Sequence, residues 1–336
     1  MSLGKTHTLS KLLSQRILLL DGALGTQIQD LRLTEEDYRG RRFINHKNQL
    51  QGNTDLLSLT QPEALREIHN EYLKAGSDII STNTFTATAI SQADYGTESL
   101  SYEINFEAAR IAADACLTMT RSKPEKPRFV AGAIGPTTRS ASLSPDVNDP
   151  GYRNVTFDEL VQDYGNCING LIDGGVDLLL FETIFDVLNC KAAIYAAKQI
   201  LRKRAIELPI MVSGTITDAS GRLLSGQTAE AFWASIRHAE PLSVGFNCAL
   251  GADELRPYIE QMAKISDCFV SAYPNRGLPN EFGEYDETVE HMTAAVEDYV
   301  KSDLVNLVGG CCGTTPEHIT AFAEIINVAA PRRTNN

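Results

Sequence analysis

The chain has 336 residues, 43% of them hydrophobic, which is enough for one large domain with a substantial core. Its formal net charge is −13, with 43 acidic residues against 30 lysines and arginines. A nucleic-acid surface needs a positive field, so the charge excludes a general nucleic-acid-binding function. No apolar run approaches the ~20 residues that cross a bilayer, and the N-terminus lacks a signal-peptide pattern. We therefore expect a cytoplasmic protein without membrane contact, whose partners are small molecules or proteins.

Short, nearly continuous apolar runs recur along the chain, as is typical of strands buried on both faces. Helical patterns separate them; one begins at Pro62 and ends before Gly76, and others follow the N-cap residues Asp186 and Thr315. The expected strands are residues 17–21, 78–82, 129–134, 177–182, 209–214, 243–247, 268–273 and 304–309.

Eight strands, each followed by a helix, predict an α/β fold of the closed (β/α)8 type, a TIM-type barrel. The alternative is an open doubly wound sheet, but no Gly-x-Gly-x-x-Gly turn follows a strand, which disfavours the nucleotide-binding form. We expect the barrel to span residues 1–330, with residues 331–336 as a polar tail or linker stump. Polar residues 32–55 and 137–155 predict two long βα insertions at the C-terminal face, where active sites of this fold lie.

The seven cysteines divide into two groups. An odd number in a long chain without a signal peptide disfavours a disulfide framework. Cys116, Cys167, Cys190 and Cys268 lie in helical or strand patterns and are interpreted as small buried hydrophobic residues. The other three follow predicted strands, at the end where a barrel builds its site: Cys248, Cys311 and Cys312.

The adjacent pair Cys311 and Cys312 is the most distinctive feature of the sequence. Adjacent cysteines rarely form a disulfide, and the flanking glycines allow both sulfurs to face one point. Cys248 adds a third sulfur, which makes a three-thiolate zinc site with an open fourth position plausible. The alternative is a set of buried or redox thiols without metal. None of the six histidines follows a strand, so an all-sulfur site suits thiol chemistry better than hydrolysis.

Two carboxylates, Asp21 and Glu182, end apolar strands and would lie in the same cleft. They could hold the ammonium group of an amino acid; the alternative is a buried acid bonded to backbone amides or to an arginine. The turn that includes Gly22 and Ala23 has backbone N–H groups that could hold a carboxylate. Its alternative is a tight turn with no ligand.

These motifs resemble the homocysteine-binding N-terminal module of cobalamin-dependent methionine synthase, in the homocysteine S-methyltransferase family. The similarity covers essentially the whole chain. Three departures are Ala23 in place of a more usual glycine, Ser81 in place of glutamate, and Arg276 within a Pro-Asn-Ala-Gly-Leu-Pro run. The matching segments are residues 20–22, 83–85, 144–150, 213–222 and 247–251 and the double-cysteine segment; segments 144–150 and 213–222 are similar to the cobalamin-dependent branch in particular.

The resemblance implies a barrel with Zn²⁺ bound by Cys248, Cys311 and Cys312, and L-homocysteine as substrate. By the same resemblance, Asp21 and Glu182 bind the amino group and Gly22 and Ala23 the carboxylate. Asn83 and Thr84 would line the pocket, and Asn247 would help fill the zinc site before substrate arrives. Methylcobalamin on a separate module would donate the methyl group, with cobalamin-binding and folate-binding modules as partners in cis or in trans.

The expected chemistry needs no catalytic side chain beyond the zinc ligands. Zinc binding deprotonates a coordinating thiol, and the thiolate is the nucleophile. Two alternatives remain. One is a homocysteine methyltransferase that uses betaine or S-methylmethionine; the other is a non-catalytic zinc-thiolate module that binds an amino-acid thiol.

Overall fold

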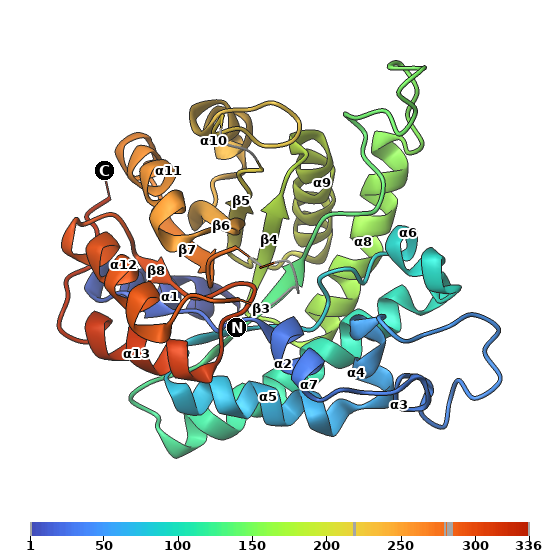
Figure 1. The fold of residues 1–336 in the computed structure, drawn as a ribbon, viewed down its shortest axis with the longest axis horizontal. Coiled ribbons are helices and arrows are strands. Elements are labelled where there is room, and N and C mark those ends of the chain that lie inside the picture. Colours follow the sequence, from blue (N-terminus) through green and yellow to red (C-terminus); the bar gives the residue numbers. More distant parts are fainter. Residues whose placement is uncertain (1, 218–219, 279, 281–284, 335–336) are drawn as a thin grey trace.

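The computed structural model describes every residue of the chain except 1, 218–219, 279, 281–284 and 335–336 (Figure 1). Asp218 and Ala219 of segment 213–222, and Asn335 and Asn336 of the expected tail, thus lie outside the described residues. All eight expected strands are present and pair in parallel. They are β1 Leu18–Leu19, β2 Ile79–Ser81, β3 Phe129–Ile134, β4 Leu178–Ile184, β5 Ile210–Gly214, β6 Ser243–Gly251, β7 Phe269–Asn275 and β8 Leu307–Val308.

The sheet closes on itself, which confirms the predicted TIM-type barrel. Its order is β1-β8-β7-β6-β5-β4-β3-β2. A bridge between Leu20 and Ile79, with a backbone hydrogen bond of 2.7 Å from Asp78 to Leu19, joins β1 to β2. The short β1 and β8 contribute only two residues each, so backbone contacts just outside the regular ladder complete the closure.

Helices surround the strands on the outside (Figure 1). The expected caps are present: Gly76 follows α5 with φ of 122°, and the Asp186 side chain accepts from two N–H groups at the start of α9. The helices are α1 Ser2–Gln15, α2 Leu24–Asp30, α3 Glu35–Arg39, α4 Leu57–Thr60, α5 Pro62–Ala75, α6 Ala89–Gln92, α7 Ser101–Ser122, α8 Phe157–Gly174, α9 Val187–Arg204, α10 Ala229–Ile236, α11 Ala252–Ile265, α12 Val289–Lys301 and α13 Pro316–Ile326, with 3-10 turns at Thr54–Leu56, Ala93–Tyr95, Glu98–Leu100 and Arg237–Ala239.

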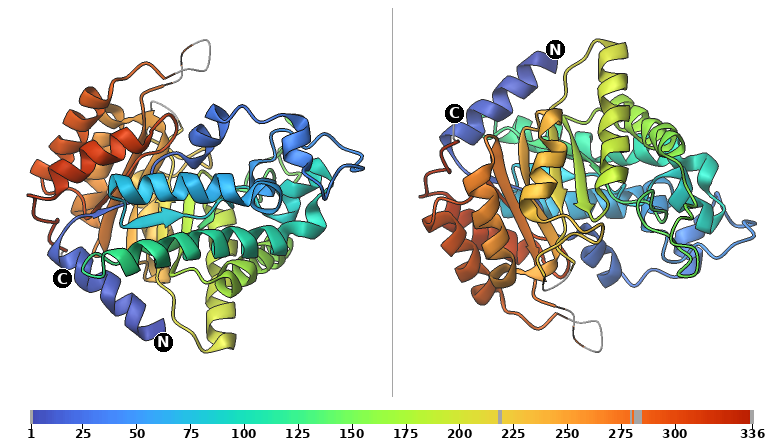
Figure 2. Two further views of the ribbon diagram at one scale, coloured as in Figure 1. Left: turned by 90° about the horizontal axis from the view of Figure 1, so that it is seen from below. Right: turned by 90° about the horizontal axis from the view of Figure 1, so that it is seen from above.

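Two apolar clusters form the core. The larger cluster lies between the strands and the surrounding helices and contains the buried Cys116 and Cys190. The smaller one fills the barrel interior and includes Leu9 and Leu13 of α1. Helix α1 therefore covers the N-terminal end of the barrel (Figure 2), and the opposite end, where the strands point, is left for a site.

Both predicted insertions follow strands at that opposite end. Residues 32–55 run from the end of α2 to the start of α4 and include α3 and one 3-10 turn. Residues 137–155 lie between β3 and α8 without a helix or strand and project away from the barrel (Figure 1). Val147, in this second insertion, is 92% exposed.

The chain after residue 330 packs against the N-terminal end of the barrel. Arg332 is 5% exposed, and its guanidinium donates to the carbonyls of Ala263, Ser266 and Cys268. Its carbonyl accepts from the Asn306 side chain at 2.7 Å. Arg332, just after the expected boundary at residue 330, is therefore held against the barrel by its own hydrogen bonds. Among the described residues, none of the helices has the length and apolar character needed to span a membrane.

Candidate metal and substrate site

Three cysteine sulfurs meet at the C-terminal end of the barrel. The Sγ atoms of Cys248, Cys311 and Cys312 lie within 4.8 Å of one another, and those of Cys248 and Cys312 are 3.7 Å apart. Two sulfurs bound at ~2.3 Å to one tetrahedral zinc ion are roughly 3.8 Å apart. The donor set therefore fits a tetrahedral ion and leaves one position for a further ligand. All seven cysteines are free thiols, and only Cys116, Cys167 and Cys190 are fully buried, whereas Cys268 is half-buried.

A β-bulge directs Cys248 toward the other two sulfurs. The pairing of β6 with β7 shifts register after Asn247, and Cys248 and Ala249 adopt positive φ angles of 62° and 58°. Residues other than glycine rarely adopt this conformation, and it costs of order 1–3 kcal/mol where it occurs. Such strain is concentrated at functional sites, and a bulge is a common way to re-aim a side chain.

Glycines shape the turn that carries Cys311 and Cys312. A Cβ atom on Gly310 would lie 2.6 Å from Cβ of Thr314, so only glycine fits there. Thr314 closes the turn, since its N–H and its hydroxyl both donate to the carbonyl of Cys311, at 3.1 and 2.7 Å. Helix α13 begins directly afterwards, and its N-terminal end favours thiolate over thiol nearby.

The thiols share their charge unevenly. Hydrogen bonds from Cys248 and Cys311, together with one from Tyr285, lower the pKa of Cys312 to about 3. The same cluster and its burial raise the pKa of Cys311 well above the ordinary value. Cys312 therefore loses its proton readily. Ionisation of all three thiols is unfavourable unless a cation compensates their negative charge. This is the electrostatic situation that a divalent ion resolves.

Asp21 and Glu182 form an acidic pair beside the sulfurs. Burial raises the pKa of Asp21 to about 7, although the N–H and hydroxyl of Ser81 both donate to it, at 2.7 and 2.9 Å. Burial, and then the charges of Asp21 and Cys312, raise the pKa of Glu182 to about 8. Among the described residues, no lysine or arginine pairs with either carboxylate. The pocket therefore carries uncompensated acid groups that favour a cationic ligand.

A second bulge, tied to the first, positions Glu182. The register between β4 and β5 shifts between Phe181 and Ile184, and Thr183 has a φ of 54°. Asn247, fully buried on β6, accepts from the Thr183 N–H at 3.0 Å and donates to the Thr183 hydroxyl at 2.8 Å. It also contacts the Cys311 sulfur at 3.9 Å. Asn247 thus links the carboxylate strand to the cysteine cluster, a connection that its expected role at the zinc site did not include.

The turn at Gly22 and Ala23 lies directly against the cysteine turn. The Ala23 N–H donates to the Thr314 hydroxyl at 3.1 Å, and the Gly313 N–H donates to the Thr26 hydroxyl at 3.0 Å. Gly22 has no room for a side chain, because a Cβ would lie 2.8 Å from the Tyr72 ring. The structure thus brings this turn into the site, but the Ala23 N–H already has an acceptor. That this turn holds the substrate carboxylate stays a proposal. For the Ala23 N–H to take part, its hydrogen bond to the Thr314 hydroxyl must break.

Asn83 and Thr84 are buried, and the Asn83 amide nitrogen and the Thr84 hydroxyl both have partners within the protein. The Asn83 amide donates to the Thr54 carbonyl at 2.7 Å, and the Thr84 hydroxyl donates to the Ala133 carbonyl at 2.7 Å. Asn83 thereby joins the first insertion to β2, and Thr84 joins β2 to β3. These contacts give both residues a bracing role, and their expected place in the pocket lining remains a prediction.

Sequence reasoning missed two tyrosines near the cluster. Tyr285, between β7 and α12, has its ring on Gly313, next to Cys312, and it contributes to the lowered pKa of Cys312. Tyr273, paired with Asn247 in the β6–β7 register, belongs to the interior cluster, which Cys311 also contacts. In the sequence, the one sign of Tyr285 is that a tyrosine occurs in the segment that follows the seventh strand, at the end of the barrel where the site lies. Arg276, the departure in that region, donates its backbone N–H to the Cys312 carbonyl at 2.9 Å.

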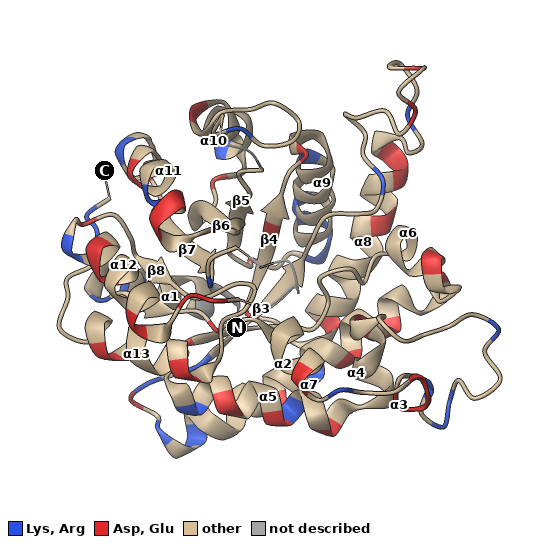
Figure 3. Cartoon of the chain, viewed as in Figure 1, with Lys and Arg blue, Asp and Glu red and all other residues tan. Residues whose placement is uncertain are grey.

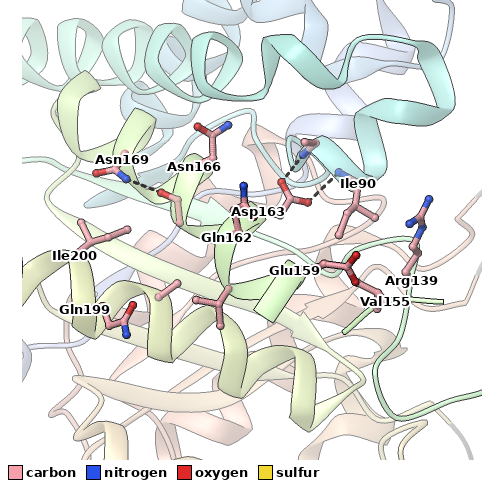
Figure 4. A pocket seen from close by; sticks show the side chains of 14 residues that line it. Ile90, Arg139, Val155, Glu159, Gln162, Asp163, Asn166, Asn169, Gln199 and Ile200 are labelled. Carbon is pink, nitrogen blue, oxygen red and sulfur yellow. Dashed lines mark hydrogen bonds between the residues drawn. The ribbon is translucent and has the colours of Figure 1, made fainter. Parts of the chain in front are cut away.

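A separate groove of about 680 Å³ lies on the outer surface, between α6, α8 and α9 (Figure 4). None of the expected site residues lines it. Asp163, one of two acidic residues in the lining, accepts from the N–H groups of Ala89 and Ile90, at 2.7 and 2.9 Å, and so caps α6. Acidic and basic residues are interspersed over the outer helices (Figure 3).

The comparisons with known proteins agree with this arrangement. The sequence profile named Homocysteine S-methyltransferase matches residues 18–326. A solved structure of the homocysteine methyltransferase MmuM from Escherichia coli, in its metallated form, is 23% identical, covers 92% of this chain and 96% of its own, and superposes with a TM-score of 0.70. Its apo form is 21% identical, covers 93% and 96%, and has a TM-score of 0.66. At this identity the two structures show a shared fold. Since the family profile extends from β1 to the end of α13, the chain belongs to the homocysteine S-methyltransferase family.

Proposed function

We propose that this protein binds L-homocysteine at the cysteine cluster and activates it for S-methylation to L-methionine, with Zn²⁺ held by Cys248, Cys311 and Cys312. The observation that carries the proposal is the juxtaposition of three converging sulfurs with two carboxylates that lack a protein cation. When bound, Zn²⁺ would keep the substrate sulfur ionised at neutral pH, where a free thiol of pKa ~8.5 is mostly protonated.

The chain's own residues divide the remaining work. Three cysteine thiolates more than neutralise a divalent ion, so the bound substrate sulfur retains electron density as a nucleophile. Asp21 and Glu182 bind the substrate ammonium group through charge-assisted hydrogen bonds. This contact fixes the distance between the amino group and the sulfur, and it selects an amino-acid thiol over a simple thiol.

For the methyl donor we propose methylcobalamin carried by a separate module, with a folate-binding module that regenerates it. The support is the similarity of segments 144–150 and 213–222 to the cobalamin-dependent branch. The first of these segments is exposed on the insertion after β3, at the end of the barrel where a donor must approach. The thiolate cluster needs reduced cysteines, which suits the expected cytoplasmic location.

A turnover experiment tests the proposal. The purified protein is incubated with L-homocysteine and, separately, with free methylcobalamin, betaine or S-methylmethionine, and L-methionine is measured by mass spectrometry. We expect methionine with methylcobalamin alone, and none after zinc is removed with a chelator. If methionine forms from betaine or S-methylmethionine instead, the protein is a homocysteine methyltransferase that uses that donor rather than methylcobalamin. If homocysteine binds but no donor gives methionine, the non-catalytic alternative, a module that only binds an amino-acid thiol, is supported.

A further inference from the structure

The hydroxyl group of Tyr273 is buried in the barrel interior without a hydrogen-bond partner. Tyr273 is 5% exposed and belongs to the smaller apolar cluster, which fills the interior. Its hydroxyl oxygen is one of the buried side-chain polar atoms that have no partner among the described residues. A buried hydroxyl without a partner costs free energy, and phenylalanine would fill the same space without that cost. The hydroxyl therefore needs an explanation other than folding.

Tyr273 lies on the wall of the barrel that carries the cysteines. Its strand, β7, pairs with β6 and β8, the two strands that lead to the three sulfurs (Figure 1). The carbonyl of the next residue, Pro274, accepts from the Cys311 N–H at 2.8 Å. In the β6–β7 register Tyr273 pairs with Asn247, whose amide contacts the Cys311 sulfur at 3.9 Å. Tyr273 is therefore part of the floor beneath the candidate metal site.

Glu182 lies on the opposite wall of the same interior. Side chains alternate along a strand, so Glu182 faces inward like Leu178 and Leu180, which belong to the interior cluster. Strand β4 is three strands away from β7 in the eight-stranded barrel. Such a barrel is just wide enough for side chains to fill its interior, so a tyrosine on one wall extends toward the other. The Tyr273 hydroxyl thus lies on the side of the site where the carboxylates are.

The Tyr273 oxygen is available as a neutral acceptor. Burial, and then the charge of Glu182, raise the pKa of Tyr273 well above its ordinary value, and the proximity of Ser213 opposes this only in part. The Ser213 hydroxyl donates instead to the Asn247 side chain, at 2.6 Å. The phenol therefore keeps its proton, and its oxygen can accept a hydrogen bond without adding negative charge to an acidic pocket.

The substrate ammonium group needs one more acceptor than the two carboxylates supply. An ammonium group has three N–H donors, and Asp21 and Glu182 are assigned to accept from it as one acceptor each. A donor that is left unpaired when the ammonium group is desolvated costs free energy. We propose that the Tyr273 hydroxyl oxygen accepts the third N–H, so that the substrate amino group is held by Asp21, Glu182 and Tyr273 together. This inference rests on the proposed function, which supplies the amino-acid thiol.

Three thiols separate the parts of the substrate that the hydroxyl could bind. L-Homocysteine has both an amino and a carboxylate group, 3-aminopropane-1-thiol lacks the carboxylate, and 4-mercaptobutyrate lacks the amino group. Calorimetric titration of each thiol into the zinc-loaded protein measures binding without any methyl donor. The test variant is Tyr273→Phe, which keeps the ring in the barrel interior and removes only the hydroxyl.

We expect Tyr273→Phe to weaken binding of homocysteine and of 3-aminopropane-1-thiol by about 5- to 10-fold each, the effect of one hydrogen bond with a neutral acceptor. Binding of 4-mercaptobutyrate and the zinc content should stay at the wild-type values. The urea midpoint of the ligand-free variant should not fall, because the lost hydroxyl had no partner. The matched control is Tyr299→Phe on α12, which removes a buried hydroxyl that donates to the Ala252 carbonyl. It should lower the midpoint and leave all three affinities unchanged.

Three results for Tyr273→Phe would overturn the inference. Equal weakening of all three thiols would mean that the hydroxyl acts on the metal or on the fold. Weakening of homocysteine and 4-mercaptobutyrate alone would assign the hydroxyl to the substrate carboxylate, and unchanged affinities would mean that it binds no part of the substrate. The wild type distinguishes these failures from failure of the proposed function: a wild type that binds none of the thiols refutes both, whereas one that binds homocysteine no better than Tyr273→Phe refutes the inference alone.

Discussion

The two ends of the barrel contain carboxylates in opposite surroundings. At the N-terminal end, the Asp78 side chain is fully buried, and Arg16 donates to both of its oxygens at 2.8 and 2.7 Å. The Leu19 N–H also donates to Asp78, at 3.0 Å, and Lys126 lies 3.7 Å away. At the C-terminal end, Asp21 and Glu182 are paired with no basic side chain among the described residues, and their pKa values rise.

The difference separates stability from binding. The carboxylate at the closed end is satisfied within the chain, so it contributes to folding without any ligand. The carboxylates at the open end are desolvated without a cation, which opposes folding of the ligand-free protein. A substrate ammonium group and a metal ion would supply the missing positive charge. The predictions below address each side of this comparison, from the largest expected effect to the smallest.

Removal of one sulfur at the open end should have the largest effect. We expect about one zinc per chain in the wild type and loss of most of it in Cys311→Ala, since two thiolates no longer form a three-sulfur set. Atomic absorption measures the metal content, and Cys268→Ala, which changes a half-buried cysteine outside the cluster, is the control. A wild type that is free of zinc after purification with reduced thiols from zinc-replete medium would refute the site.

At the closed end, Asp78→Ala should lower the free energy of unfolding by about 3 kcal/mol, because Arg16 and the Leu19 N–H lose a buried partner. The matched control is Asp298→Ala, which removes an exposed partner of Arg256 and should cost less than about 1 kcal/mol. Urea denaturation measures both. Equal losses in the two variants would show that the buried ion pair does not stabilise the closed end as inferred.

Glu182→Gln should weaken homocysteine binding by about 10- to 150-fold, the value of a charge-assisted hydrogen bond of ~1.5–3 kcal/mol, and leave the zinc content unchanged. Binding of 3-mercaptopropionate, which lacks the amino group, should change far less. Calorimetric titration of both thiols makes the comparison. If the two are weakened equally, Glu182 acts on the metal or the fold, and its assignment to the amino group fails.

Asp21 should give the smallest effect, and one that depends on pH. Its pKa of about 7 in the folded chain exceeds its ordinary value of 3.8, so the folded state retains a proton that the unfolded state loses between these values. This group therefore makes the ligand-free protein less stable as pH rises from about 4 to about 7. Asp21→Asn should be more stable than the wild type by about 1–2 kcal/mol at pH 8, and by less at pH 5.

Urea unfolding at the two pH values, without homocysteine, gives the difference. A wild type and an Asp21→Asn variant with the same pH dependence would mean that Asp21 does not titrate in this range. The variant should bind homocysteine more weakly even where it is more stable, because one of the two carboxylates that face the substrate ammonium group is replaced by a neutral amide.

Much of the barrel could be predicted from the sequence because its strands are buried on both faces. Such strands are continuous apolar runs, and all eight were located, with ends that moved by a few residues. The double cysteine between glycines and the acidic strand ends were visible for the same reason, since the chain order of a barrel places every strand end at one face. The three converging sulfurs agree with that expectation.

Other features were decided only by tertiary structure. Asp21 and Asp78 both adjoin apolar strands, but only contacts made by Arg16, 62 residues from Asp78, neutralise one of them. The strained backbone at Thr183 and Cys248, the occupied N–H of Ala23, and Tyr285 on Gly313 likewise depend on residues distant in the chain. Apolar periodicity depends on which residues are buried, so it can be recognised from a short stretch of sequence. Hydrogen bonds and charge pairs depend on which partner the closed barrel brings within a few ångströms, and this is fixed only when the strands meet.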